Sequence, residues 1–236
     1  MSDMVRRKPR GQLGYISVGS DAAFHAVALP QSKEEIECWI VEHARAVAAD
    51  AAPFHQAAHP IRNPQSHFDF TLPTASGNEY LDLMEVVILP VGARGYEDGR
   101  ASYDAEAMAE ALLSRIAAKS RRYGAQRVKV HLLLYATDWR LRLAKLVAEL
   151  LTVMLSRRPH IFATICYFAP YDEEDGEYVR LYPAERAQVE EYATRMNEAK
   201  HRGTRTWIIM ADLRRARLKS GPGENSGSGW SPGKQA

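Results

Sequence analysis

The stretch 67–89, HFDFTLPTASGNEYLDLMEVVIL, constrains the fold most, because it predicts two strands joined by a turn. Its first part, 67–72, alternates polar and apolar side chains, which is the period of a strand with one buried face. Its second part, 80–89, is an apolar run rich in β-branched and long side chains. Turn residues lie between the two parts: Ser76, Gly77 and Asn78. Gly and Asn tolerate positive φ, so an antiparallel hairpin is the expected structure.

Acidic residues lie in both predicted strands. Asp69 is in the first, and Asp82 and Glu85 interrupt the apolar run of the second. If the turn centres on Gly77, antiparallel pairing places Asp69 opposite Glu85, with Cβ atoms roughly 5 Å apart on one face. Two carboxylates that close repel each other unless a proton or a cation lies between them. We therefore expect Asp69 and Glu85 to share one cation. A solvated position on the open face of a sheet is the alternative for Asp69, whereas apolar neighbours favour burial of Glu85.

The composition is that of a globular protein. The chain has 236 residues, of which 46% are hydrophobic and 25% are charged, and this is typical of one soluble domain. We expect a single α/β domain over 12–219, a flexible basic arm over 1–11 and a disordered tail, rich in Gly, Ser and Pro, over 220–236. No apolar run reaches the ~18 residues of a membrane span, so no membrane partner is expected. The oligomeric state stays open.

The compartment is predicted from the N-terminus and from the cysteines. Basic residues near the N-terminus are not followed by an apolar segment, so no secretory signal is predicted. The two cysteines, Cys38 and Cys166, lie in apolar surroundings without the spacing of metal ligands. Buried free thiols suit a reducing environment, and we expect a cytoplasmic location.

Helical and strand patterns alternate along the rest of the chain. Helices are predicted over 32–52, 104–124, 138–156 and 184–201, and strands over 12–18, 127–136, 160–170, 177–182 and 204–213. Parallel strands separated by helices need crossover connections, whereas the hairpin is antiparallel. The predicted fold class is therefore α/β, with a mixed central sheet and helices on both of its faces.

Two histidines offer an alternative metal site. His55 and His59 have the i, i+4 spacing that binds zinc when it occurs on a helix, and Asp69 could complete such a site. Pro53 and Pro60 bracket the pair, however, and leave room for at most two helical turns. The prolines favour solvated histidines in a loop.

A lysine lies within the apolar stripe of the helix predicted over 104–124. Lys119 falls on the helix face shared by Met108, Leu112, Ile116 and Tyr123. Its ammonium either reaches an acidic partner inside the protein or extends to solvent along an apolar stem.

Basic residues occur in four clusters: Arg6-Arg7-Lys8 with Arg10, Arg121-Arg122, Arg157-Arg158, and Arg214-Arg215 with Arg217 and Lys219. Such clusters could contact the phosphate backbone of a nucleic acid. Cations are also favoured at helix C-termini by the helix dipole, and the sequence alone leaves both interpretations open.

The order helix, hairpin with Asp and Glu, helix, strand resembles the core of the restriction-endonuclease-like superfamily, the P-D-(D/E)-x-K phosphodiesterases. The resembling part covers about 32–136. In that superfamily the first acid begins one strand, and the second acid and a lysine alternate on the next. Phe-Asp stands here for Pro-Asp, and Glu-Val-Val stands for Glu-x-Lys. Asp69 and Glu85 thus match the motif, while Val87 does not.

The resemblance implies a nuclease in which Asp69 and Glu85 hold Mg²⁺ or Mn²⁺ and a nearby cation stabilises the phosphate. Val87 cannot supply that cation, so Lys119 is the residue expected to complete the catalytic set, with Arg115 and Arg122 as alternatives. DNA and RNA are both open as substrates. If Lys119 does not face the acids, the resemblance implies a catalytically inactive module that binds a protein or a nucleic acid.

Overall fold

The computed structural model describes residues 14–18, 22–64, 67–87, 102–124, 128–138, 141–172, 174–201 and 207–209. These ranges contain most of the predicted hairpin and the whole of the helix predicted over 104–124. The predicted arm, 1–11, and the predicted tail, 220–236, lie outside the described residues, and so does the segment 88–101 after the hairpin.

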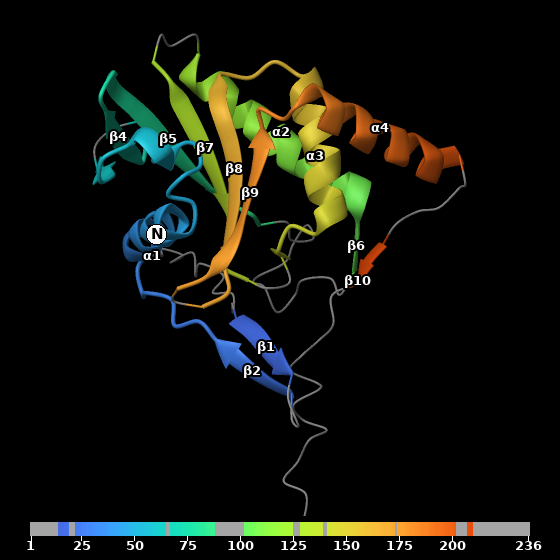
Figure 1. Ribbon diagram of the computed structural model, residues 1–236, viewed down its shortest axis with the longest axis horizontal. Helices are drawn as coiled ribbons and strands as arrows, with labels where there is room; N and C mark the ends of the chain where they lie inside the picture. The colour runs from blue at the N-terminus through green and yellow to red at the C-terminus, as the bar shows by residue number, and fades with distance from the viewer. Residues whose placement is uncertain are drawn as a thin grey trace, which may run out of the picture.

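A six-stranded mixed sheet forms the centre of the protein, in the order β3-β4-β5-β7-β8-β9 (Figure 1). Its strands are β3 (Ile61–Arg62), β4 (Phe70–Thr74), β5 (Gly77–Glu85), β7 (Val130–Tyr135), β8 (Phe162–Pro170) and β9 (Gly176–Tyr182). β5, β7 and β8 are parallel, and the remaining neighbours are antiparallel. The predicted mixed sheet is confirmed.

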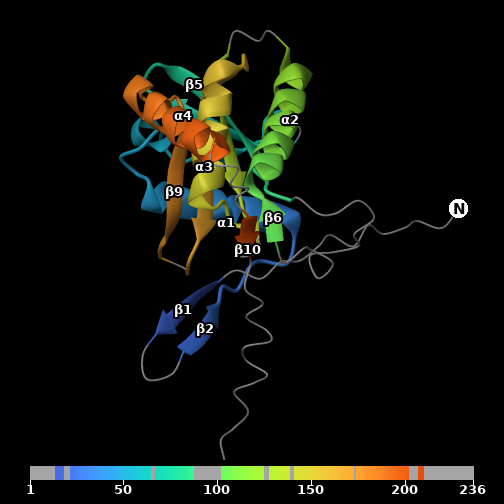
Figure 2. The ribbon, with the colours of Figure 1, turned by 90° about the vertical axis from the view of Figure 1, so that its right-hand side faces the viewer.

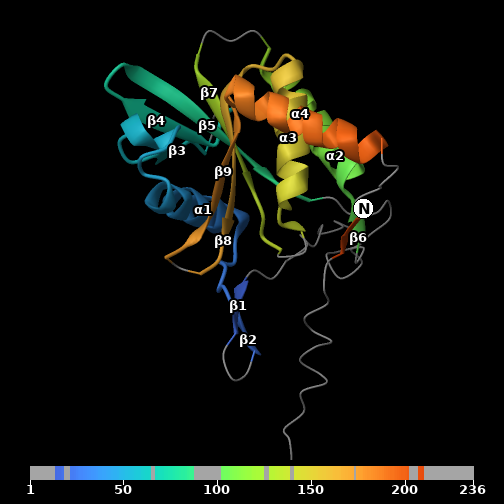
Figure 3. The same cartoon turned by 45° about the vertical axis from the view of Figure 1, so that its right-hand side comes forward.

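Helices cover both faces of this sheet (Figure 3). They are α1 (Lys33–Val47), α2 (Ala105–Tyr123), α3 (Lys145–Arg157) and α4 (Arg186–His201). α1 packs on the face that carries Leu81 and Leu83, while α2 and α3 pack on the face that carries Met84 and Val86. Each of α2 and α3 is the crossover between two parallel strands, as the sequence pattern predicted.

The helix ends follow capping rules. Ser32 and Glu35 form the capping box at the start of α1. Asp104 accepts a hydrogen bond from the Ala107 backbone at the start of α2, and Gly124 follows its last residue. α3 begins at Lys145, later than the start at residue 138 that the sequence predicted.

Two short strand pairs lie outside the six-stranded sheet. β1 (Gly14–Val18) pairs with β2 (Ala22–Ala26), and this hairpin projects beyond one end of the sheet in Figure 2. β6 (Ser102–Asp104) pairs with β10 (Trp207–Ile209), which lies within the strand predicted over 204–213. That predicted strand therefore adds a small ribbon at the start of α2 and does not extend the main sheet.

The β4–β5 hairpin has a tighter turn than the sequence suggested. Thr74 pairs with Gly77, so that two residues connect the strands. The Thr74 hydroxyl accepts from the Ser76 backbone at 3.2 Å and donates to the Gly77 carbonyl at 2.7 Å. Gly77 has φ +124°, a conformation that L side chains rarely adopt, and it is the first residue of β5 rather than the centre of the turn.

This turn overturns the predicted strand register. Phe70 pairs with Leu81, so one further step of the same ladder places Asp69 opposite Asp82. The prediction that Asp69 lies opposite Glu85 is wrong. The turn held by the Thr74 hydroxyl shifts the strand register by three residues from the predicted one. An odd shift exchanges the faces of the partner strand, which is why Asp82 rather than Glu85 falls beside Asp69.

Candidate active site

Asp82 is the buried centre of a polar group between the sheet and α2. Its side chain points from β5 to the face covered by α2, and the residue is 1% exposed. Lys119 Nζ lies 2.7 Å from Asp82 Oδ2, and the Tyr123 hydroxyl donates a hydrogen bond to the same oxygen. Lys119 and Tyr123 are one helical turn apart, so both side chains leave α2 on the same side.

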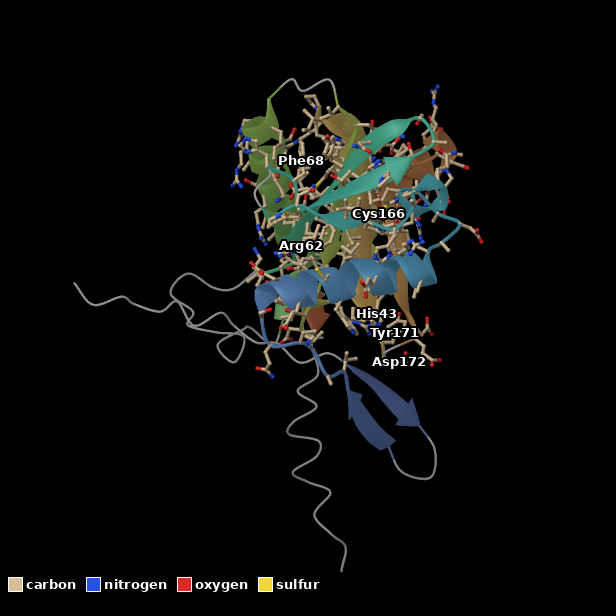
Figure 4. All side chains as sticks on the ribbon, turned by 90° about the vertical axis from the view of Figure 1, so that its left-hand side faces the viewer. His43, Arg62, Phe68, Cys166, Tyr171 and Asp172 are labelled. Carbon is tan, nitrogen blue, oxygen red and sulfur yellow. The ribbon has the colours of Figure 1, made fainter. Side chains whose placement is uncertain are left out.

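Asp69 joins this group from the neighbouring strand. Its Oδ2 accepts a hydrogen bond from the Leu83 backbone at 2.7 Å, and its carboxyl group is hydrogen-bonded to that of Asp82. Asp69 lies just before β4, so its side chain occupies the position where a further ladder hydrogen bond would form. Phe68, which precedes it, packs against Tyr80 and Tyr123 with ring centroids 4.8 and 4.9 Å away. These ring contacts fix the entry into β4. Figure 4 labels Phe68 above Arg62, with α1 below both.

The contact between the two carboxyl groups alters the acidity of Asp82. Burial raises the pKa of Asp82 to about 7, and the hydrogen bond with Asp69 raises it too, whereas Lys119 and Tyr123 oppose this shift. Burial and the Asp82 carboxyl also raise the pKa of Tyr123, so its hydroxyl keeps its proton. Asp82 therefore gains or loses its proton close to neutral pH.

Glu85 lies on the opposite face of β5, toward α1. It is partly exposed and accepts a hydrogen bond from the Thr137 hydroxyl at the end of β7. On α1, Lys33 forms an ion pair of 3.1 Å with the buried Glu37. Burial alone would lower the pKa of Lys33, but its hydrogen bond to Glu37 and the attraction of Asp69 and Glu85 raise it. Lys33 is thus a cation in the field of both predicted acids.

The predicted site residues are distributed over two faces. Asp69 stands at the strand end between them, Glu85 faces α1, and Lys119 faces α2. Lys119 is not a snorkelling side chain, because it is 16% exposed and ends on a carboxylate. Sequence reasoning noticed Asp82 but did not place it in the site, and it missed Lys33. An acid inside an apolar strand was the available signal for Asp82, while nothing in the α1 sequence distinguishes Lys33 from an ordinary exposed residue.

The alternative cations lie nearby. Arg115, one turn before Lys119 on α2, donates to the Val87 carbonyl at 2.9 Å. Its guanidinium is therefore held beside the backbone of the position where the motif expects a lysine. Arg122 is exposed at the end of α2.

The zinc alternative receives no support. His55 and His59 are exposed, and His59 Nδ1 lies 3.4 Å from an Arg45 guanidinium nitrogen. Among the residues that the structure describes, no three His, Cys, Asp or Glu side chains are grouped to hold a metal ion.

Comparison with known proteins gives no identification. No protein-family model matches the chain. No curated protein and no solved structure matches it either.

Within the described ranges, none of the helices is long and apolar enough to cross a membrane. Cys38 and Cys166 are both free thiols, and burial raises the pKa of each.

Replacing Tyr123 by Phe is expected to destabilise the protein by about 1–2 kcal/mol, because a buried acceptor oxygen of Asp82 loses one of its donors. Urea unfolding at pH 8 measures the change. Tyr80→Phe is the matched control, since Tyr80 also packs on Phe68 but its hydroxyl has no hydrogen-bond partner in the described structure. Equal stabilities for the two variants would contradict a stabilising Tyr123–Asp82 bond.

Proposed function

We propose that this protein is a metal-dependent nuclease that hydrolyses phosphodiester bonds in DNA or RNA. The observation that carries the proposal is the position of Asp69 at the start of β4, hydrogen-bonded to Asp82 and in the same electrostatic field as Glu85. An acid at a strand start, next to acids on the paired strand, is the arrangement of the restriction-endonuclease-like motif. The order of helices and strands also supports a core of that kind, and the free thiols suit a cytoplasmic location.

The donor set fits a hard divalent cation. Asp69 and Glu85 are partly exposed and supply carboxylate oxygens, whereas Asp82 is buried and already engaged by Lys119 and Tyr123. Mg²⁺ is commonly held by one or two carboxylates and keeps waters and substrate phosphates as its other ligands. Asp69, at the strand end between the two faces, and Glu85, on the face toward α1, both act electrostatically on Lys33 and would be the residues to hold Mg²⁺ or Mn²⁺. When bound, such a cation lowers the pKa of a water and neutralises charge on the phosphate.

The protein's own residues then have separate tasks. Asp82 orients Asp69 through their hydrogen bond. Lys119 neutralises the negative charge of Asp82 and so influences the site indirectly. Lys33 is 55% exposed, so its ammonium is accessible to a substrate phosphate. Arg115 is a second cation at the end of β5. Positive charge preorganised at a developing anion is a large source of catalysis.

A catalytically inactive module that binds a nucleic acid or a protein is the second candidate. It is favoured by one specific observation: the Lys119 charge is neutralised by buried Asp82, and the apolar Val87 stands where the motif has a lysine. In that case the polar group would hold β4, β5 and α2 together without contacting a substrate.

A nuclease assay separates the two candidates. Purified protein is incubated with single- and double-stranded DNA and RNA in Mg²⁺, in Mn²⁺ and in excess chelator. Cleavage that needs the metal and is absent from an Asp69→Asn preparation supports the nuclease. If none of these substrates is cleaved with either metal, the nuclease proposal is rejected in favour of the binding module.

A further inference from the structure

The ends of α2 and α3 bring exposed arginines together at one end of the protein. β5, β7 and β8 are parallel, so the two crossover helices both end where β7 and β8 begin. Figures 1 and 2 show these two helix ends at the top of the view, on one side of the sheet. The exposed arginines there are Arg121, Arg122, Arg157 and Arg158, here called the arginine surface.

None of the four arginines has an ion pair with the described residues. Lys129, at the start of β7, adds another exposed cation at this end, but Glu79 neutralises it at 2.8 Å. The whole chain has a formal net charge of only +2, so the arginine surface is a local concentration of charge. Among the described residues the guanidinium groups of these four arginines also have no hydrogen-bond acceptor, so their N–H donors are open to solvent.

Stabilisation of the helix ends accounts for part of this pattern. A cation in the last turn interacts favourably with the negative end of the helix dipole, and the effect falls off within that turn. It does not require two arginines on each helix, nor two helices that end side by side. An arginine that caps a helix also keeps donors free for a second acceptor, because it has five N–H groups.

We propose that the arginine surface binds the phosphate backbone of a nucleic acid. Arginine matches phosphate through paired hydrogen bonds, and backbone contacts of this kind fix position without reading sequence. The surface also adjoins the candidate active site, because the last turns of α2 carry Lys119 and Tyr123 inward and Arg121 and Arg122 outward. The choice of nucleic acid as the partner rests on the proposed function, whereas the anionic character of the partner follows from the charge.

Salt dependence of binding provides the test. Fluorescence anisotropy is measured with labelled DNA and RNA, single- and double-stranded, in chelator so that no cleavage occurs. The variant replaces all four arginines by glutamine: Arg121→Gln, Arg122→Gln, Arg157→Gln and Arg158→Gln. We expect it to bind roughly 10³- to 10⁴-fold more weakly at 0.1 M salt. The slope of log K against log salt for duplex should fall by about 0.9 for each phosphate that the variant no longer neutralises, which is about 3–4 in total.

A control variant removes three exposed cations elsewhere, by Lys145→Gln, Arg180→Gln and Arg186→Gln. It should change the slope by less than about 1, and thermal unfolding should show both variants folded. The paired variants Arg121→Gln/Arg122→Gln and Arg157→Gln/Arg158→Gln should each show about half of the full slope change.

Three outcomes overturn the inference: no binding by the unmodified protein, binding with equal slopes in the four-arginine variant, or binding to anionic lipid vesicles instead of nucleic acid. Cleavage by the unmodified protein together with an unchanged slope would reject the arginine surface and keep the proposed function. Strong, arginine-dependent binding without cleavage would keep the surface and reject the nuclease.

Discussion

Asp69→Asn is expected to lower metal-dependent cleavage by roughly 10²–10³ or more. Loss of a carboxylate ligand removes several kcal/mol of charge stabilisation, and each 1.4 kcal/mol is about a factor of ten in rate. The amide oxygen of Asn can still accept from the Leu83 backbone, so the hairpin should keep its structure. Initial rates at saturating metal and substrate, with a metal titration for each protein, measure the loss.

Glu85→Gln tests the second predicted ligand in the same way, and a similar loss is expected. Glu79→Gln is the control, because Glu79 lies on the same strand and the same face as Glu85 but pairs with Lys129 and His131, which are not residues of the candidate site. Its cleavage rate should stay within about twofold of the unmodified protein once the folded fraction is taken into account. Undiminished cleavage in Asp69→Asn would show that the Asp69 carboxylate has no part in the reaction.

Local sequence patterns predicted the elements but not the register of the hairpin. Ser32 with Glu35, and Asp104 with Gly124, mark helix ends through contacts between near neighbours, and these appear as expected. The turn after Thr74 has two residues, and the hydrogen bonds of the Thr74 side-chain hydroxyl set its length rather than the glycine itself. A pattern of residue types does not contain that choice, and one odd step exchanges every acid on β5 between the two faces.

The composition of the site was only partly predictable for a related reason. The apolar stripe of α2 placed Lys119 toward the sheet, and the structure agrees. Which carboxylate it meets depends on how β5 is paired and on how α2 crosses it, and both are properties of the packed fold. Lys33 interacts electrostatically with Asp69 and Glu85 from α1, a separate element whose position over the sheet no local pattern specifies.

Lys119→Met should destabilise the protein in a pH-dependent way. Met retains most of the apolar stem, so at pH 5, where Asp82 carries a proton in the folded state, the loss should be small. Above about pH 7 the folded protein keeps Asp82 ionised only with the help of Lys119 at 2.7 Å. Without that cation the buried carboxyl group stays protonated, because an unpaired charge in an apolar site costs more than retaining the proton.

The size of this effect follows from proton linkage. Between the ordinary pKa of an unfolded Asp, about 4, and pH 7, the folded forms of both proteins retain a proton that the unfolded chain releases, so Asp82 lowers their stabilities equally. Above pH 7 Asp82 ionises in the folded unmodified protein but not in folded Lys119→Met, so only the stability of the unmodified protein stops falling. The difference between the two proteins should therefore grow by about 1.4 kcal/mol for each further pH unit and add about 2–3 kcal/mol at pH 9.

Urea unfolding of both proteins at pH 5, 7, 8 and 9 measures the difference directly. The double variant Asp82→Asn/Lys119→Met serves as the control, because without a titrating carboxyl group at residue 82 its stability should lack this pH-dependent term. A Lys119→Met protein whose stability loss is the same at pH 5 and pH 9 would show that Lys119 does not hold the charge of Asp82. Lys119 would then not influence the candidate site through Asp82, and Lys33 or Arg115 would be the cation to test next.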